Sequence, residues 1–145
     1  MSDILKINKA ELFKTVLNDI KEYKYRNTRY NLDFSIVAVY CKEACVNLEE
    51  LQKKLRKTDK VIYLNDNLCC VILDGVSEKE CEKAAENVNY HLLQINANYK
   101  YYLSAADSKN YNSEYRDMIQ NLFERLEYAI ENNLENIVIY QDYVI

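Results

Sequence analysis

Two short apolar runs separated by three polar residues constrain the fold of this chain more than any other feature. Val61 to Leu64 and Leu68 to Leu73 flank the segment Asn65-Asp66-Asn67. Apolar runs joined by a short polar turn are typical of a β-hairpin. We therefore expect a hairpin of two strands at the centre of the fold.

Helices and strands are predicted to alternate along the rest of the chain. Residues 34–40 form a nearly continuous apolar run rich in β-branched residues, which indicates a strand covered on both faces. Tyr99 to Ala105 and Ile137 to Tyr140 read as two further strands. Apolar residues at helical spacing predict helices over 9–25, 47–57, 77–95 and 113–130. This order contains a βαββαβ unit, so we expect an α+β, ferredoxin-like fold whose helices flank a central, mostly antiparallel sheet.

Asparagines are expected to supply most of the special backbone positions, because the chain has one glycine and no proline. Asparagine adopts the left-handed conformation more readily than other side chains. Asn65, Asn67 and the pair Asn132-Asn133 are therefore expected at turns and at a helix end. The expected N-caps are Asn47, Ser77 with Glu80 in a capping box, and Asn112 or Ser113. No stretch reads as a linker, so residues 1–145 are expected to form a single domain.

Composition argues against several kinds of partner and compartment. The formal net charge of −4 argues against nucleic acid or an anionic membrane as a main partner. No apolar run is long enough to span a membrane, and the N-terminus lacks the regions of a signal peptide, so a cytoplasmic protein is expected. The five cysteines are then expected to be reduced.

Three further features have an ordinary structural explanation that we favour over a functional one. Cys41 and Cys45 could form half of a metal site, but no second pair has ligand spacing, so no metal is expected. His91, the single histidine, is expected at the edge of the core. A basic cluster is formed by Lys21, Lys24, Arg26 and Arg29. We expect it to be a solvated face whose charge is balanced by Glu22 and Asp19, and the alternative is a site for an anion or nucleic acid.

Several short motifs resemble the GGDEF domain of diguanylate cyclases, which condense two GTP molecules into cyclic di-GMP. Arg29-Tyr30 followed by residues 34–37 is similar to the end of that family's first helix and its first strand. Arg56-Lys57-Thr58-Asp59 resembles the R-x-x-D that precedes the family's hairpin, and the spacing from Asp59 to Asn65 is the family's own. Residues 122–129 and 136–138 resemble its closing helix and strand.

The sequence departs from that family where the resemblance places the chemistry. Leu68 stands at the position of the catalytic glutamate, and Tyr40 and Lys42 stand at the positions of two metal-binding aspartates. Ile130 replaces a phosphate-binding lysine. Two-metal phosphoryl transfer needs carboxylates to hold the cations. We therefore expect a degenerate GGDEF-like domain that is not an enzyme, with no catalytic residue, no metal and no cofactor.

The resemblance leaves Arg56 and Asp59 as the candidate ligand-binding residues. In the family, R-x-x-D is an inhibitory site for cyclic di-GMP, where the arginine bonds guanine and phosphate and the carboxylate accepts from guanine. Other arginines usually complete that site, and one of their positions is Asn87 here. The alternative is a surface ion pair, or an arginine that favours a helix C-terminus.

Three functions remain open from the sequence. The leading one is a catalytically inactive regulatory or protein-interaction module in bacterial signalling, with a protein partner or a homo-oligomer. The second is a cyclic di-GMP receptor that binds through Arg56 and Asp59. The third is an unrelated ferredoxin-like enzyme whose site the sequence does not reveal, and a reactive thiol at Cys41 or Cys45 would favour it. The interaction module would be favoured if one exposed patch contained Tyr101, Tyr102, Tyr111 and Tyr115.

Overall fold

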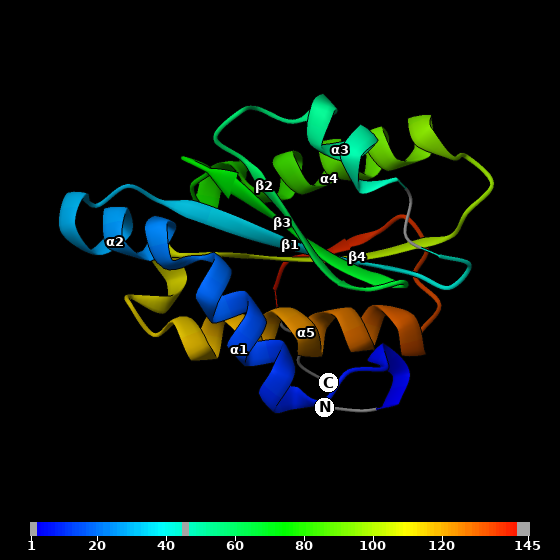
Figure 1. Cartoon of the computed structure of the whole chain (residues 1–145), viewed down its shortest axis with the longest axis horizontal. Helices are drawn as coiled ribbons and strands as arrows, with labels where there is room; N and C mark the ends of the chain where they lie inside the picture. The colour runs from blue at the N-terminus through cyan, green and yellow to red at the C-terminus, as the bar shows by residue number, and fades with distance from the viewer. Residues whose placement is uncertain (1–2, 45–46, 142–145) are drawn as a thin grey trace.

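In the computed structural model, which describes residues 3–44 and 47–141, the described residues form a five-stranded sheet with helices on both faces (Figure 1). The strand order is β2-β3-β1-β4-β5, and every pairing is antiparallel except that of β4 with β5. The strands are β1 (Phe34–Cys41), β2 (Lys60–Asn65), β3 (Leu68–Asp74), β4 (Tyr101–Asp107) and β5 (Val138–Ile139). The α+β prediction with a mostly antiparallel sheet and an embedded βαββαβ order is confirmed.

β1 is the centre of the sheet, as its apolar sequence predicts. It lies between β3 and β4, so that Val37 is opposite both Val71 and Ala105. All eight residues of β1 are buried. A strand with neighbours on both edges and helices on both faces has no solvent-facing side, which explains why its sequence shows no polar alternation.

Five α-helices and two short 3-10 turns complete the described part of the chain. Figure 1 shows α1 and α5 on one side of the sheet and α3 and α4 on the other. Alternate residues of β1 follow this division, since Ile36 packs in the core under α1 and α5 and Val37 packs in the core under α4. The bounds are α1 (Lys9–Asp19), α2 (Lys21–Tyr30), α3 (Leu48–Lys54), α4 (Glu78–Ile95), α5 (Tyr115–Glu131), η1 (Asp3–Leu5) and η2 (Lys109–Tyr111).

The single helix predicted over residues 9–25 is wrong. The structure has two helices that meet at Ile20, which is fully buried, and α2 continues to Tyr30. The periodic apolar spacing runs across this break and therefore does not reveal it. The change of direction places α2 near the end of β3, where Arg26 reaches Asp74.

The predicted caps are partly correct. Asn47 accepts the backbone amides of Glu49 and Glu50, and α5 ends at Asn132 as expected. Ser77 precedes α4, but its hydroxyl donates to the Glu80 carboxylate at 3.1 Å instead of capping a backbone amide.

The N-cap predicted for α5 is wrong, whereas Asn65 and Asn67 lie at the hairpin turn as predicted but without the left-handed conformation. Glu114, rather than Asn112 or Ser113, is the N-cap of α5. Asn65 and Asn67 do not adopt positive φ, a conformation found among the described asparagines at Asn31, Asn112, Asn133 and Asn136.

None of the helices in residues 3–44 and 47–141 combines the length and the apolar character needed to cross a membrane.

Candidate functional site

The tip of the β2–β3 hairpin, where the family resemblance places catalytic groups, is held together by side-chain amides. Asn65 accepts the Asn67 backbone amide at 2.8 Å and donates to the Leu5 carbonyl at 2.8 Å. The Asn67 side chain donates to the carbonyls of Cys41 and Lys42 at 3.0 and 3.2 Å. These bonds tie the turn to the end of β1 and to η1, so both asparagines serve the fold.

The other positions that the resemblance singles out have no common environment. Leu68 is fully buried, Tyr40 is buried with its ring centroid 6.2 Å from that of Tyr102, and Lys42 is exposed. Ile130 packs against the core under α1 and α5. Among the residues with described positions, no three His, Cys, Asp or Glu side chains gather as a metal site requires.

Cys41 is a buried thiol at the end of β1. Its Sγ donates to the Glu43 carboxylate at 3.3 Å, and burial raises its pKa to about 11. A thiol with such a pKa is protonated near neutral pH and is therefore a poor nucleophile. Cys45 lies outside the described residues, so its pairing with Cys41 stays untested.

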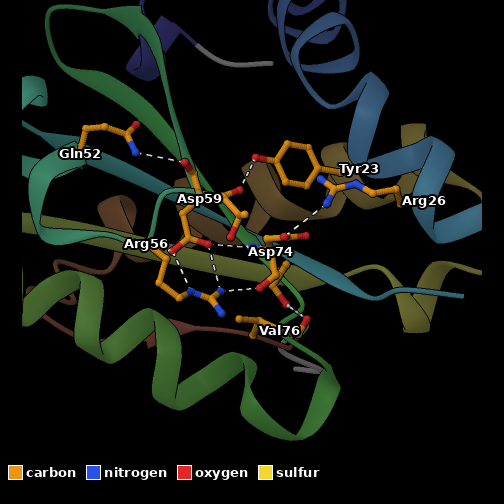
Figure 2. A network of polar contacts seen from close by, with 9 residues as sticks. Tyr23, Arg26, Gln52, Arg56, Asp59, Asp74 and Val76 are labelled. Atoms are coloured by element: carbon orange, nitrogen blue, oxygen red, sulfur yellow. Dashed lines mark hydrogen bonds and ion pairs between the residues drawn. The ribbon is translucent and has the colours of Figure 1, made fainter. Parts of the chain in front are cut away.

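Arg56 and Asp59 meet in the connection between α3 and β2. The guanidinium donates through Nε and Nη2 to the two carboxylate oxygens of Asp59 at 3.2 and 3.0 Å. The same carboxylate accepts the backbone amides of Arg56 and Asp74 at 3.1 and 2.9 Å. Four donors therefore converge on a side chain that is only 3% exposed, whereas the Arg56 side chain is 60% exposed (Figure 2).

The two residues consequently have different capacities for a ligand. Each oxygen of Asp59 already accepts two hydrogen bonds, which uses its ordinary lone-pair capacity. The hydrogen bond to Asp59 raises the pKa of Arg56, so the guanidinium stays charged. Arg56 is thus the accessible charged group, and Asp59 fixes its position.

Asp74, at the end of β3, connects this pair to α2. Its carbonyl accepts from Arg56 Nη2, and its carboxylate pairs with Arg26 at 3.4 Å. Tyr23 donates its hydroxyl proton to the Thr58 carbonyl at 2.7 Å. Figure 2 shows Tyr23 reaching from α2 toward the loop that carries Asp59, and Arg26 reaching toward Asp74. The network therefore joins α2, the α3–β2 connection and the end of β3.

Gln52 is a residue of this network that the sequence does not identify as such. Its amide donates to the Asp59 carbonyl at 3.0 Å, and its oxygen accepts the Val61 backbone amide at 3.0 Å. The sequence indicates only that Gln52 is a helical residue. Its two bonds depend on how α3 meets β2, which local sequence does not specify.

A pocket of about 280 Å³ lies beside Arg56, between the α3–β2 connection and α4. Its polar lining includes Lys54, Asn87 and His91. His91 is half-buried, as expected at the edge of the core, and its Nδ1 has no hydrogen-bond partner in the described part of the chain. Two cations, an amide and an imidazole around a small hollow suit an anionic ligand that also carries a hydrogen-bonding ring.

The tyrosines that would favour an interaction surface do not form one. Tyr101, Tyr102 and Tyr115 are buried, and Tyr111 is partly buried. Tyr101 donates inside the protein to the carbonyls of Leu92 and Asn96. These four side chains therefore give no support to the interaction module.

No protein-family model and no curated protein matches this chain. Solved structures do match it. The GGDEF domain of PA1120 from Pseudomonas aeruginosa has a TM-score of 0.69 at 8% identity, over 88% of this chain and 93% of that one. The active GGEEF domain of a diguanylate cyclase from Vibrio cholerae has a TM-score of 0.68 at 13% identity, over 94% of this chain and 98% of that one.

A third match is the GGDEF domain of DgcB from Caulobacter crescentus in complex with c-di-GMP. Its TM-score is 0.57 at 6% identity, over 85% of this chain and 84% of that one. At such low identities the matches establish the fold alone. They confirm the resemblance to GGDEF domains at that level.

The expectation that the chain is not an enzyme is contradicted by these matches. Domains with this fold come from diguanylate cyclases, and one of them is described as active. The residues at positions 40, 42 and 68 therefore do not by themselves support that expectation.

Proposed function

We propose that this chain is a regulatory domain of cyclic di-GMP signalling and that it binds the dinucleotide at Arg56. The observation that carries the proposal is an exposed guanidinium, fixed by Asp59, beside a pocket that also presents Lys54, Asn87 and His91. A solved domain of the same fold, from DgcB, is in complex with c-di-GMP.

The chemistry of the pocket fits part of the dinucleotide. The charged N–H groups of an arginine pair with phosphate and with the ring acceptors of guanine. Nη1 of Arg56 makes no hydrogen bond within the described residues, so its protons are available to a ligand. A volume of about 280 Å³ is near the lower end for ligand sites. We therefore place one base in the pocket and the phosphates outside it, near Lys54 and Arg56.

Asp59 has a positioning role in this proposal. Its carboxylate is occupied by four protein donors, so a ligand bond to it would require one of them to leave. Arg56 supplies the direct contact. The burial of Tyr101, Tyr102 and Tyr115 makes a ligand-binding role better supported than an interaction surface built on those tyrosines.

The test is isothermal titration of cyclic di-GMP into wild type and Arg56→Ala. Lys53→Ala is the matched control, because it removes the same charge from an exposed position that does not line the pocket. Loss of charge-assisted hydrogen bonds worth about 1.5–3 kcal/mol corresponds to roughly 10- to 100-fold weaker binding by Arg56→Ala. Lys53→Ala is expected to bind as wild type does.

Arg56→Lys keeps the positive charge at this position but removes the guanidinium. It is expected to bind more weakly than wild type, because lysine lacks the Nε and Nη2 donors whose bonds to Asp59 and Asp74 hold Nη1 in place. A parallel incubation with GTP and Mg²⁺ measures any dinucleotide synthesis. The proposal is wrong if wild type gives no heat of binding, or if Arg56→Ala and Lys53→Ala bind equally well.

A further inference from the structure

The basic face of α2 borders two adjoining hollows on the surface. One, of about 700 Å³, separates α2 from the α3–β2 connection, and Lys57 and Thr58 line its far wall. The other, of about 490 Å³, lies between α2 and Tyr115 at the start of α5. Lys21 and Tyr25 line both hollows. We call the two together the α2 groove.

Most cations of the α2 groove have no acidic partner. Arg26 pairs with Asp74, but none of the other four, Lys21, Lys24, Arg29 and Lys57, forms an ion pair with a residue whose position is described. The sequence suggests Asp19 and Glu22 as balancing charges. Asp19 instead pairs with Lys60 at 3.5 Å. The expected neutralisation of this face is therefore incomplete.

Aromatic side chains are interleaved with these cations. Tyr25 and Tyr30 are each 58% exposed, and their rings meet edge to face at 6.2 Å between centroids. Lys24 lies over the ring of Tyr115 at 5.6 Å, and Arg29 lies over the ring of Tyr30 at 5.9 Å. The groove thus offers aromatic ring surface beside cations that outnumber its one carboxylate, Glu22.

The charge of the groove is opposite to that of the rest of the chain. Its five cations and the acid Glu22 together carry a formal +4, so a chain of net −4 has −8 outside the groove. A long polyanion such as nucleic acid would extend beyond this patch to a remainder of the chain whose net charge has its own sign, which is unfavourable. A short acidic segment meets the cations alone.

From these observations we infer that the α2 groove is a docking site for an acidic peptide segment of a partner protein, with an apolar side chain seated beside Tyr25. Carboxylates of the segment pair with Lys21, Arg29 and Lys57 at its edges. Charge complementarity of this kind sets specificity and association rate more than total affinity. The inference does not depend on nucleotide binding at Arg56.

The experiment measures the fluorescence anisotropy of a short labelled peptide that repeats two glutamates and one leucine. Wild type is compared with the double variant Lys21→Glu, Arg29→Glu. The matched control is Lys79→Glu, Lys83→Glu, which makes the same change in net charge at two exposed positions on α4. Reversing two contacting charges is expected to weaken binding about tenfold or more, and the control is expected to stay within about twofold of wild type.

Two further arms test the nature of the partner. Tyr25→Ser is expected to weaken the leucine-containing peptide but not a glutamate-only peptide, since only the first uses the ring. A single-stranded oligonucleotide is expected to bind more weakly than the peptide. The inference is overturned if the peptide does not bind to wild type, or if the α4 variant loses as much peptide affinity as the groove variant. It is also overturned if the oligonucleotide binds more tightly than the peptide. Circular dichroism of each variant checks that it is folded.

Discussion

Replacing Asp59 should destabilise the fold far more than replacing the arginine with which it pairs. Asp59→Ala removes an acceptor that serves four donors, two of them backbone amides at the start of the loop and at the end of β3. Arg56→Ala removes only a side chain that is 60% exposed. The two halves of one ion pair are therefore expected to contribute unequally to the free energy of unfolding.

The magnitude follows from what each substitution leaves behind. Asp59→Ala leaves the amides of Arg56 and Asp74 without their carboxylate, at about 1–1.5 kcal/mol each, and also removes the guanidinium contact. We expect a total loss of about 3 kcal/mol. After Arg56→Ala the buried carboxylate keeps both backbone donors and the lost guanidinium is mostly in solvent, so the expected loss is under about 1 kcal/mol. Asp59→Asn, which keeps one acceptor oxygen, is expected to lie between them.

Urea denaturation followed by far-ultraviolet circular dichroism at neutral pH measures these differences. For a domain of this size, about 3 kcal/mol corresponds to a fall in Tm of roughly 10 °C. The reasoning would be refuted if Arg56→Ala cost as much as Asp59→Ala, or if Asp59→Ala cost less than about 1 kcal/mol. Either result would mean that the bonds of the carboxylate to the two backbone amides contribute little to stability.

Two more predictions concern backbone strain and pH. Gly75 has a φ of +72°, and a methyl group added to its Cα would meet no atom within 4 Å. Gly75→Ala is therefore expected to lower the free energy of unfolding by about 1 kcal/mol through backbone conformation alone, and Gly75→Asn by less. Urea denaturation measures both. Equal stability of alanine variant and wild type would contradict this. Burial raises the pKa of Cys41 from 9.0 to about 11 and also raises that of Cys81. The folded state then holds these protons to higher pH than the unfolded state does, so stability is expected to be intact below pH 9.0 and to fall as pH rises toward about 11. A free energy of unfolding that is flat or rising over that interval would be inconsistent with this sign.

The sheet could be predicted from the sequence because the composition of its strands reflects their environment. The uniform apolar run of β1 needs two covered faces, and three polar residues mark the turn of the hairpin. Helix ends were harder to predict. The break at Ile20 leaves the apolar spacing unchanged, and Asn112 and Ser113 both have positive φ, so neither can act as an ordinary N-cap.

The candidate site could be predicted only in part. Arg56 and Asp59 lie three residues apart, so their pairing is a local event. The amide of Asp74, which completes the shell around Asp59, comes from another strand and depends on the register of the hairpin. The α2 groove depends on where the chain bends at Ile20 and on the position of Lys57 across from it. Such features require the tertiary structure.

The central place of β1 also has a consequence for the order in which the protein is made. Its partners β3 and β4 follow it in the chain, so Phe34–Cys41 leaves the ribosome before either can pair with it. The segment is uncharged, apolar and free of proline, which is the composition of sequences that assemble with one another when unpaired. Until Tyr101–Asp107 has been synthesised, one edge of this strand lacks its neighbour. The strand that organises the finished sheet is thus also a segment exposed to misassembly in a nascent chain.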